Sequence, residues 1–206
     1  MKVLLINGSP HEKGCTYTAL SLIAGELKAQ GIETEILHVG GQPVGGCIGC
    51  GGCRSGNGCV FGGVVNEAIE KAKTADAFVF GSPVHYASAA GNMASFMDRL
   101  AYAGGKYLAY KPAAVCCSAR RAGTTSTLDQ LVKYPQFFHM PLVNGSYWAM
   151  VHGSNPEQVL QDAEGCAVMQ ELGRNMAWLL HCIKAGKAAG IDHPQNPPRP
   201  MTNFIR

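Results

Sequence analysis

Apolar and polar residues alternate along this chain in two different rhythms. Short apolar runs that end at turns are typical of buried parallel strands, and they occur at residues 2–7, 33–38, 77–82, 112–118 and 141–148. Between these runs, apolar residues recur at helical spacing over residues 16–30, 64–74, 91–103, 124–138 and 156–186. Asn155 and Pro156 suit the N-cap and the first position of the last predicted helix.

The regular succession of strands and helices predicts the fold. It indicates a three-layer αβα protein of the α/β class, in which a doubly wound, five-stranded parallel sheet carries helices on both faces. Five strands fit the order 2-1-3-4-5, in which ligands bind at the carboxyl ends of the strands, where the winding reverses between strands 1 and 3. We expect residues 1–190 to form this domain and the proline-rich residues 191–206 to form an extended tail.

Composition narrows the classes of function. The formal net charge is +3 and no basic run is interleaved with aromatic residues, which argues against nucleic acid as a partner. No apolar stretch approaches the ~20 residues of a membrane span, and the N-terminus lacks the apolar core of a signal peptide. We therefore expect a cytoplasmic protein, in which the nine cysteines are free thiols, metal ligands or redox groups rather than disulfides.

The loop after the first strand, NGSPHEKGCTYT (7–18), runs into the start of a helix. The free N–H groups and the dipole at a helix start attract an anion, Ser9 and Thr16 can add hydroxyl donors, and Gly14 lets the backbone curl. The sequence has neither a P-loop nor G-x-G-x-x-G, so a phosphomonoester such as FMN is the better ligand. The alternative is a polar turn with a simple helix cap. Cys15 is expected to have a lowered pKa at this helix start.

Two further loops follow strands that end at the same edge. In GSPVHYASAAG (81–91), Pro83 sets the direction of the chain, and Val84, His85 and Tyr86 can offer backbone N–H groups and a flat side chain to a flavin ring. In SARRAGTT (118–125), an arginine can pair with the phosphate of FMN or of a nicotinamide, or it can simply be solvated.

Together these loops resemble the NAD(P)H-dependent FMN reductase family of flavodoxin-like proteins. The resemblance rests on Ser9-Pro10 through Thr16 and on GSPVHYASAAGNMASFMDR (81–99), and the segments 175–191 and 202–206 resemble flavodoxin-family NAD(P)H oxidoreductases. It implies noncovalent FMN, NAD(P)H as co-substrate and a homodimer or homotetramer. The implied contacts to the phosphate and then to the ring are Ser9, His11, Gly14, Cys15 and Thr16, followed by Pro83, Val84, His85, Tyr86, Ser118, Arg120, Gly123 and Thr124. His11 and Cys15 stand where the family often has arginine and asparagine.

Four cysteines, Cys47, Cys50, Cys53 and Cys59, form the pattern C-x2-C-x2-C-x5-C in a glycine-rich loop. Four thiolates suit a [4Fe–4S] cluster or a tetrahedral zinc ion, and a reduced, metal-free loop is the third alternative. The spacing resembles that of iron–sulfur flavoproteins. Because the loop follows the second strand, we expect it on the flavin side of the sheet.

The combined interpretation is an FMN-dependent NAD(P)H oxidoreductase that reduces a small acceptor such as a flavin, a quinone or a nitro compound. No catalytic side chain is predicted, because the flavin carries the chemistry. One alternative is an electron carrier that exchanges electrons with a ferredoxin-like partner. Another is a thiol or zinc sensor that uses the cysteine loop as a switch.

Overall fold

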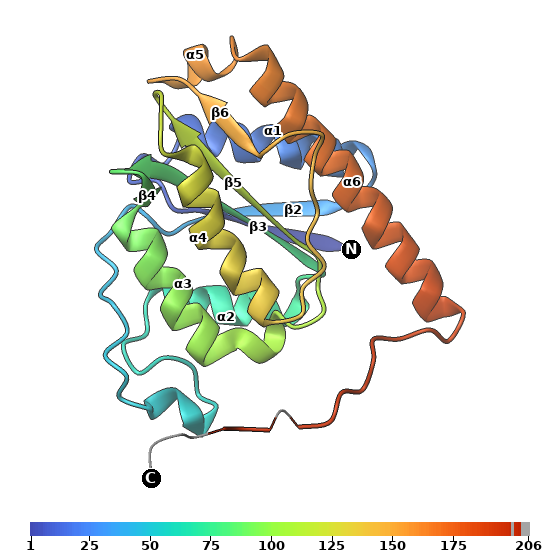
Figure 1. The fold of residues 1–206 in the computed structure, drawn as a ribbon. Coiled ribbons are helices and arrows are strands. Elements are labelled where there is room, and N and C mark those ends of the chain that lie inside the picture. The colour runs from blue at the N-terminus through green and yellow to red at the C-terminus, as the bar shows by residue number, and fades with distance from the viewer. Residues whose placement is uncertain (199, 203–206) are drawn as a thin grey trace.

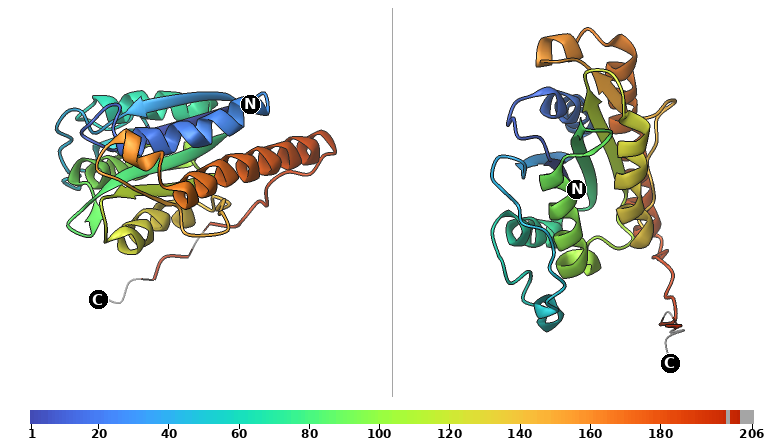
Figure 2. Two further views of the ribbon diagram at one scale, coloured as in Figure 1. Left: turned by 90° about the horizontal axis from the view of Figure 1, so that it is seen from above. Right: turned by 60° about the vertical axis from the view of Figure 1, so that its left-hand side comes forward.

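The structure is a computed structural model that describes residues 1–198 and 200–202. A central sheet lies between two layers of helices, as the views in Figures 1 and 2 show. The strands are β1 (Lys2–Asn7), β2 (Glu33–His38), β3 (Ala77–His85), β4 (Ser88–Ala89), β5 (Ala113–Ala119) and β6 (Met150–His152). The helices are α1 (Cys15–Ala29), α2 (Val64–Thr74), α3 (Gly91–Gly104), α4 (Thr124–Phe137), α5 (Pro156–Val159) and α6 (Ala163–Ala188), with 3₁₀ turns η1 (Gly52–Ser55) and η2 (Gly105–Tyr107).

The sheet has the order β2-β1-β3-β5-β6, and all of these neighbours are parallel. This confirms the predicted α/β fold and the predicted order of five parallel strands. The sequence did not indicate β4, which pairs antiparallel with the end of β3 and makes a hairpin. The winding reverses at β1 and β3, so the crevice between the carboxyl ends of these strands is the ligand position expected for this topology.

Two apolar cores flank the sheet. On one face, Leu5 and Val79 pack against Ile23 of α1 and Met176 of α6, the two helices that lie side by side in Figure 2. On the other face, buried residues of α2, α3 and α4 pack against the alternate side chains of the same strands, among them Phe80. The period of two along each strand explains this division.

The fifth parallel strand was predicted at residues 141–148, but β6 occupies only Met150–His152. Leu142 makes a single bridge to Ala113. The chain then leaves the sheet, because the Glu171 carboxylate on α6 accepts hydrogen bonds from the Ser146 N–H and Oγ, both at 2.7 Å. A side chain from another element therefore takes the place of a strand partner.

The predicted long helix 156–186 is two helices. Asn155 caps the short α5, as predicted, by accepting from the Gln158 N–H at 2.9 Å. Asp162 then caps α6, because its carboxylate accepts from the Gly165 N–H at 2.9 Å and from the His152 N–H at 2.7 Å. The second contact ties the helix start to β6, so the break depends on a neighbouring strand.

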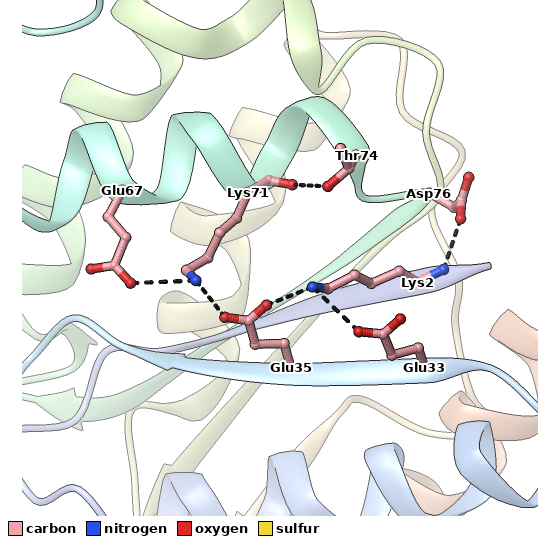
Figure 3. A network of polar contacts seen from close by, with 7 residues as sticks. All are labelled: Lys2, Glu33, Glu35, Glu67, Lys71, Thr74 and Asp76. Carbon is pink, nitrogen blue, oxygen red and sulfur yellow. Dashed lines mark hydrogen bonds and ion pairs between the residues drawn. The ribbon is translucent and has the colours of Figure 1, made fainter.

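Charged residues surround the amino ends of β1 and β2, at the opposite end of these strands from the crevice. Figure 3 shows Glu35 between two ammonium groups, with 2.8 Å to Lys2 Nζ and 2.6 Å to Lys71 Nζ. Hydrogen bonds from Lys2 and then Lys71 lower the pKa of Glu35. The network joins β1, β2 and α2, and Figure 3 shows it between these two strands and the helix.

In the tail, residues 191–198 and 200–202 form no helix or strand. The other tail residues lie outside the described part of the chain, and they include most of the segment 202–206 that resembles flavodoxin-family oxidoreductases. His193 stacks on the ring of Tyr110 with 4.3 Å between centroids, and Asn196 Nδ2 donates to the Tyr110 hydroxyl at 2.6 Å. Within the described chain, no helix is both long and apolar enough to cross a membrane.

Candidate functional site

Three loops converge at the carboxyl ends of β1, β3 and β5 (Figure 1). They are residues 8–14, the tip of the β3–β4 hairpin and residues 120–123. Each contains residues that the sequence predicted as FMN contacts, so the fold brings the predicted loops to one edge of the sheet.

The loop after β1 is held in shape by its own polar groups. Asn7 is buried; its Oδ1 accepts from the Ser9 N–H at 3.1 Å and its Nδ2 donates to the Glu12 carbonyl at 2.9 Å. The Ser9 Oγ in turn accepts from the His11 N–H at 3.1 Å. Asn7 was missed as a functional residue, although a buried asparagine that ends an apolar strand is a usable signal.

Helix α1 begins without a side-chain cap. Its N-cap residue is Gly14, and no side chain accepts a hydrogen bond at that position. The backbone N–H groups of Cys15, Thr16 and Tyr17 have no acceptor within the helix, and together with the helix dipole they form a site for an anion. This arrangement fits the phosphate of FMN.

The pKa of Cys15 was predicted to be lowered, and the structure shows the opposite. Burial is the main reason that the pKa of its thiol is raised rather than lowered. Its Sγ donates to the carbonyl of Gly153 at 3.6 Å. The side chain therefore packs toward the loop after β6, and only the backbone of Cys15 is suited to anion binding.

The loop after β2 approaches the first loop closely. A Cβ on Gly40 would lie 2.2 Å from the Ser9 carbonyl oxygen, so only glycine fits there. The same oxygen lies 2.7 Å from Nε2 of His38. Neither Gly40 nor His38 was identified from the sequence, because the contact depends on the pairing of β1 with β2.

Thr16 and Ser118 join the loops that follow β1 and β5. Their hydroxyl oxygens lie 2.8 Å apart, and the two residues are only 1% and 4% exposed. The Thr16 hydroxyl therefore bonds to another residue of the protein, and the backbone N–H of Thr16 remains available to a ligand.

The β3–β4 hairpin extends from the carboxyl end of β3, at the same edge of the sheet as the loop after β1. The sequence suggested a loop at Pro83–His85, but these residues belong to β3. Tyr86 and Ala87 make the turn with φ of 48° and 60°, a conformation that normally selects asparagine or glycine. Tyr86 is 106% exposed at the tip. Strain of this kind at non-glycine residues is common at ligand sites.

Helix α4 holds the hairpin in place. Gln130 Oε1 accepts from the Ser88 hydroxyl at 2.7 Å and from the Ala89 N–H at 2.9 Å. Ser126 Oγ donates to the Ala87 carbonyl at 2.7 Å. Sequence reasoning missed both α4 residues, because a polar residue on the exposed face of a helix gives no sign of its partner.

The loop after β5 lies against this hairpin. Gly123 has φ of +86°, and a Cβ there would lie 2.6 Å from the Ala87 Cα and 2.9 Å from the Val84 Cγ1. The next residue, Thr124, is buried. Arg120 and Arg121 are exposed, so either is free to turn toward a phosphate at the rim.

The cysteine loop projects beside α2 and α3 (Figure 1). Its four predicted ligands line one cavity of about 330 Å³, which we call the cysteine cavity; it is also lined by Ile48, Phe61, Arg99, Tyr102 and their neighbours. Over the described residues, no three His, Cys, Asp or Glu side chains are grouped closely enough to hold a metal ion. The arrangement is therefore not preassembled for a zinc ion. The four thiols share this cavity and are the ligand type that a [4Fe–4S] cluster takes, although they are not gathered around one point.

Two residues of α3 fix the ends of the loop. Asn92 Oδ1 accepts from the Val44 N–H at 3.1 Å. Arg99 donates to the carbonyls of Gly45 at 3.3 Å and Gly62 at 3.1 Å. Both lie within the segment whose resemblance to the FMN reductases was noted above, but the sequence alone gave them no role.

A second cavity, of about 470 Å³, lies at the edge of β5 between α4 and residues 142–149. None of the predicted site residues lines it. It reflects the departure of the chain from the sheet before β6, and it is separate from the crevice.

Comparisons with known proteins agree with this geometry. The sequence matches the family described as NADPH-dependent FMN reductase over residues 1–155. An iron–sulfur flavoprotein of Methanocaldococcus jannaschii is 28% identical over 192 residues, which cover 89% of this chain and 100% of that protein. An iron–sulfur flavoprotein of Archaeoglobus fulgidus is 36% identical over 99 residues, 48% of each chain.

A solved flavodoxin from the domain Archaea has a TM-score of 0.60 at 14% identity, with 88% of this chain and 99% of that chain covered. This likeness supports the fold alone, whereas the family match spans the three rim loops and the cysteine loop. The chain therefore belongs to the NADPH-dependent FMN reductase family, and it is a flavoprotein oxidoreductase with the flavodoxin-like fold.

Proposed function

We propose that the protein is an FMN-dependent oxidoreductase that oxidises NADH or NADPH and reduces a small acceptor such as a flavin, a quinone or a nitro compound. The observation that carries this proposal is the uncapped start of α1, which opens into the crevice beside the loops after β3 and β5. FMN supplies the chemistry when bound, since its ring can take a hydride and release electrons.

The chain's own residues bind and orient the cofactor in this proposal. The N–H groups at Cys15 and Thr16, with Ser9, His11 and Gly14, hold the phosphate. The ring lies against the hairpin and the loop after β5, in contact with Pro83, Val84, His85, Tyr86, Ser118, Arg120, Gly123 and Thr124. The histidine at position 11 binds a phosphate less firmly than an arginine would, so the backbone donors carry most of the interaction.

FMN binding and nicotinamide oxidation are tested together. Purified protein is titrated with FMN, and the bound flavin is then mixed anaerobically with NADH or NADPH while its absorbance is followed. We expect one FMN per chain and bleaching by at least one nicotinamide. Ser9→Ala should weaken FMN binding, whereas Thr74→Ala, which removes a hydroxyl beside the network of Figure 3, should not. Failure to bind FMN, or bound flavin that neither nicotinamide reduces, contradicts the proposal.

A [4Fe–4S] cluster on Cys47, Cys50, Cys53 and Cys59 completes the proposed function. The shared cavity supports it, and so do the two relatives named as iron–sulfur flavoproteins. Protein purified without oxygen should contain iron and acid-labile sulfide, and Cys53→Ser should abolish both. Because Cys182 is exposed and lies on α6, Cys182→Ser serves as the control that keeps both. Wild-type protein without iron contradicts the cluster.

Electron exchange with a ferredoxin-like partner is the second candidate function. The exposed apolar side chains of Ile48, Phe61 and Tyr102 at the cysteine cavity favour it, because such a patch suits a protein partner. Reduced ferredoxin should then reduce the protein faster than either nicotinamide does. The reverse order of rates favours the reductase.

The assembly follows from the resemblance and not from this chain's geometry. We propose a homodimer or homotetramer in which residues 1–190 form the FMN-binding domain and residues 191–206 are dispensable for FMN binding. Light scattering on the full chain measures the assembly, and a monomer contradicts it. A chain that ends at residue 190 and fails to bind FMN contradicts the assigned domain.

A further inference from the structure

Arg99 lies beneath the cysteine loop and is unusual in its surroundings. The residue is only 6% exposed. Its Nε donates to Cys59 Sγ at 3.2 Å, its Nη1 to the Gly45 carbonyl at 3.3 Å and its Nη2 to the Gly62 carbonyl at 3.1 Å. One guanidinium therefore contacts a predicted metal ligand and both ends of the loop that carries the other ligands.

The positive charge of Arg99 has no acidic partner. In the part of the chain that the structure describes, no carboxylate forms an ion pair with it. The ring of Phe61 lies 5.5 Å away and attracts the cation without neutralising it. A buried charge is costly unless it is paired, so the cysteine cavity is an electrostatically suitable place for an anion.

The proposed occupant of this cavity is an anion. A [4Fe–4S] core bound by four thiolates has a net negative charge, because the thiolate charges exceed the positive charge of the core. A metal-free loop of neutral thiols would leave Arg99 buried without a counter-charge. The cluster therefore explains the position of Arg99, and the metal-free alternative does not.

Cys59 is held on its other side as well. Its N–H donates to Asn66 Oδ1 at 2.8 Å, and Asn66 Nδ2 donates to its carbonyl at 3.0 Å. With Arg99 at the sulfur, both the backbone and the side chain of Cys59 are fixed from neighbouring helices. Cys47 and Cys50, in contrast, are exposed. Cys59 is thus the anchored ligand around which the rest of the loop closes.

We propose that Arg99 is the positioning residue and counter-cation of the cluster, and that its N–H···S bond to Cys59 raises the cluster's reduction potential. This inference rests on the cluster part of the proposed function. One-electron reduction by an external reductant such as dithionite adds a negative charge and breaks no bond. A cation and a hydrogen bond at a ligand sulfur favour the more negative form.

The test compares Arg99→Met, Arg99→Lys and the control Arg54→Met in anaerobically purified protein. Arg54 lines the same cavity but is exposed, so its removal subtracts the same charge where water screens it. The measurements are iron and sulfide per chain, the midpoint potential of the cluster by EPR-monitored redox titration, and bound FMN with the thermal melt as a check of folding.

We expect Arg99→Met to reduce the equilibrium constant for cluster reduction by about tenfold, which corresponds to a shift of about −59 mV for one electron. Arg99→Lys keeps the charge but not the planar fork, so its shift should be smaller, and Arg54→Met should shift least. If Arg99→Met folds and binds FMN but loses its iron while Arg99→Lys retains it, the counter-cation role is also supported.

Two results overturn the inference, and they differ from each other. Iron and potential that are equal in wild type and Arg99→Met, or a shift no larger than that of Arg54→Met, refute the role of Arg99 and leave the cluster intact. Wild-type protein that contains FMN but neither iron nor sulfide refutes the cluster and the role of Arg99 with it. Nicotinamide oxidation is measured separately and does not depend on either result.

Discussion

The buried hydroxyl pair of Thr16 and Ser118 offers a sharp test of how the crevice is held together. The two oxygens are 2.8 Å apart, and both residues are buried. Thr16→Val keeps the shape of the side chain but leaves the Ser118 hydroxyl without a partner. Such a buried unsatisfied group costs about 2 kcal/mol, which lowers the Tm of a chain of this size by about 4–8 °C.

The double variant distinguishes this explanation from a loss of packing. With Thr16→Val and Ser118→Ala combined, no hydroxyl is left unsatisfied, so the loss of stability should be smaller than the sum of the two single losses. The melts are recorded on FMN-free protein, because a bound ligand adds its own stabilisation. Thr18→Val is the matched control, since the Thr18 hydroxyl bonds only to the Gly14 carbonyl one turn earlier in the chain.

Either of two results would refute a coupling between these hydroxyls. One is a Tm of Thr16→Val that is no lower than that of Thr18→Val. The other is additivity of the two single changes within about 0.5 kcal/mol, the range found for independent sites. In both cases the contact between the loops after β1 and β5 would contribute no coupling to the stability of the crevice.

Three other substitutions test the charged network of Figure 3, the loop after β5 and the hairpin. Glu35→Gln should destabilise the protein at neutral pH by about 1 kcal/mol or less. Because Lys2 and Lys71 lower the pKa of Glu35, the difference in unfolding free energy between wild type and variant should shrink as the pH falls below 4.5, the ordinary pKa of a glutamate. A difference that persists in urea unfolding at acid pH contradicts this. Gly123→Ala should lower the Tm, since the new Cβ would lie 2.6 Å from the Ala87 Cα, and an unchanged melt excludes that clash. Ala87→Gly should stabilise by about 0.5 kcal/mol through relief of its positive φ, and a lower Tm would show that no strain is stored.

The elements that the sequence predicts well are those whose patterns are local. The bounds of β1, β2 and α2 agree with the predicted ranges. The order of the parallel strands follows from their alternation with helices. β4 was missed because a two-residue strand has no periodicity to detect.

The errors at the C-terminal half have tertiary causes. The apolar segment 141–148 has the composition of a strand, but Glu171 on a distant helix binds the Ser146 N–H and takes the chain away from the sheet. The break before α6 depends on the hydrogen bond between Asp162 and the His152 N–H of β6. Neither partner can be identified from the residues near it in the sequence.

The candidate site also has a part that the sequence predicts and a part that it does not. Loop composition and the expected topology placed the residues predicted to contact FMN at one edge of the sheet. The contacts that fix these loops join positions far apart in the chain: Thr16 and Ser118 are separated by 102 positions, and Arg99 and Cys59 by 40. Such pairs are set by the packed fold, so they could not be predicted from one sequence.

Helix α3 links the two proposed cofactor sites. It starts directly after the hairpin, and Asn92 in its first turn donates to the carbonyls of Gly40 and Gln42 at the beginning of the cysteine loop. Arg99 lies seven residues further along, on the same face of the helix and about 10 Å away. The cysteine loop contains several glycines and could not hold a fixed position by itself. The separation between the flavin crevice and the cysteine cavity is therefore a property of α3, and changes to the helix should disturb both sites, whereas changes within the loop should disturb only one.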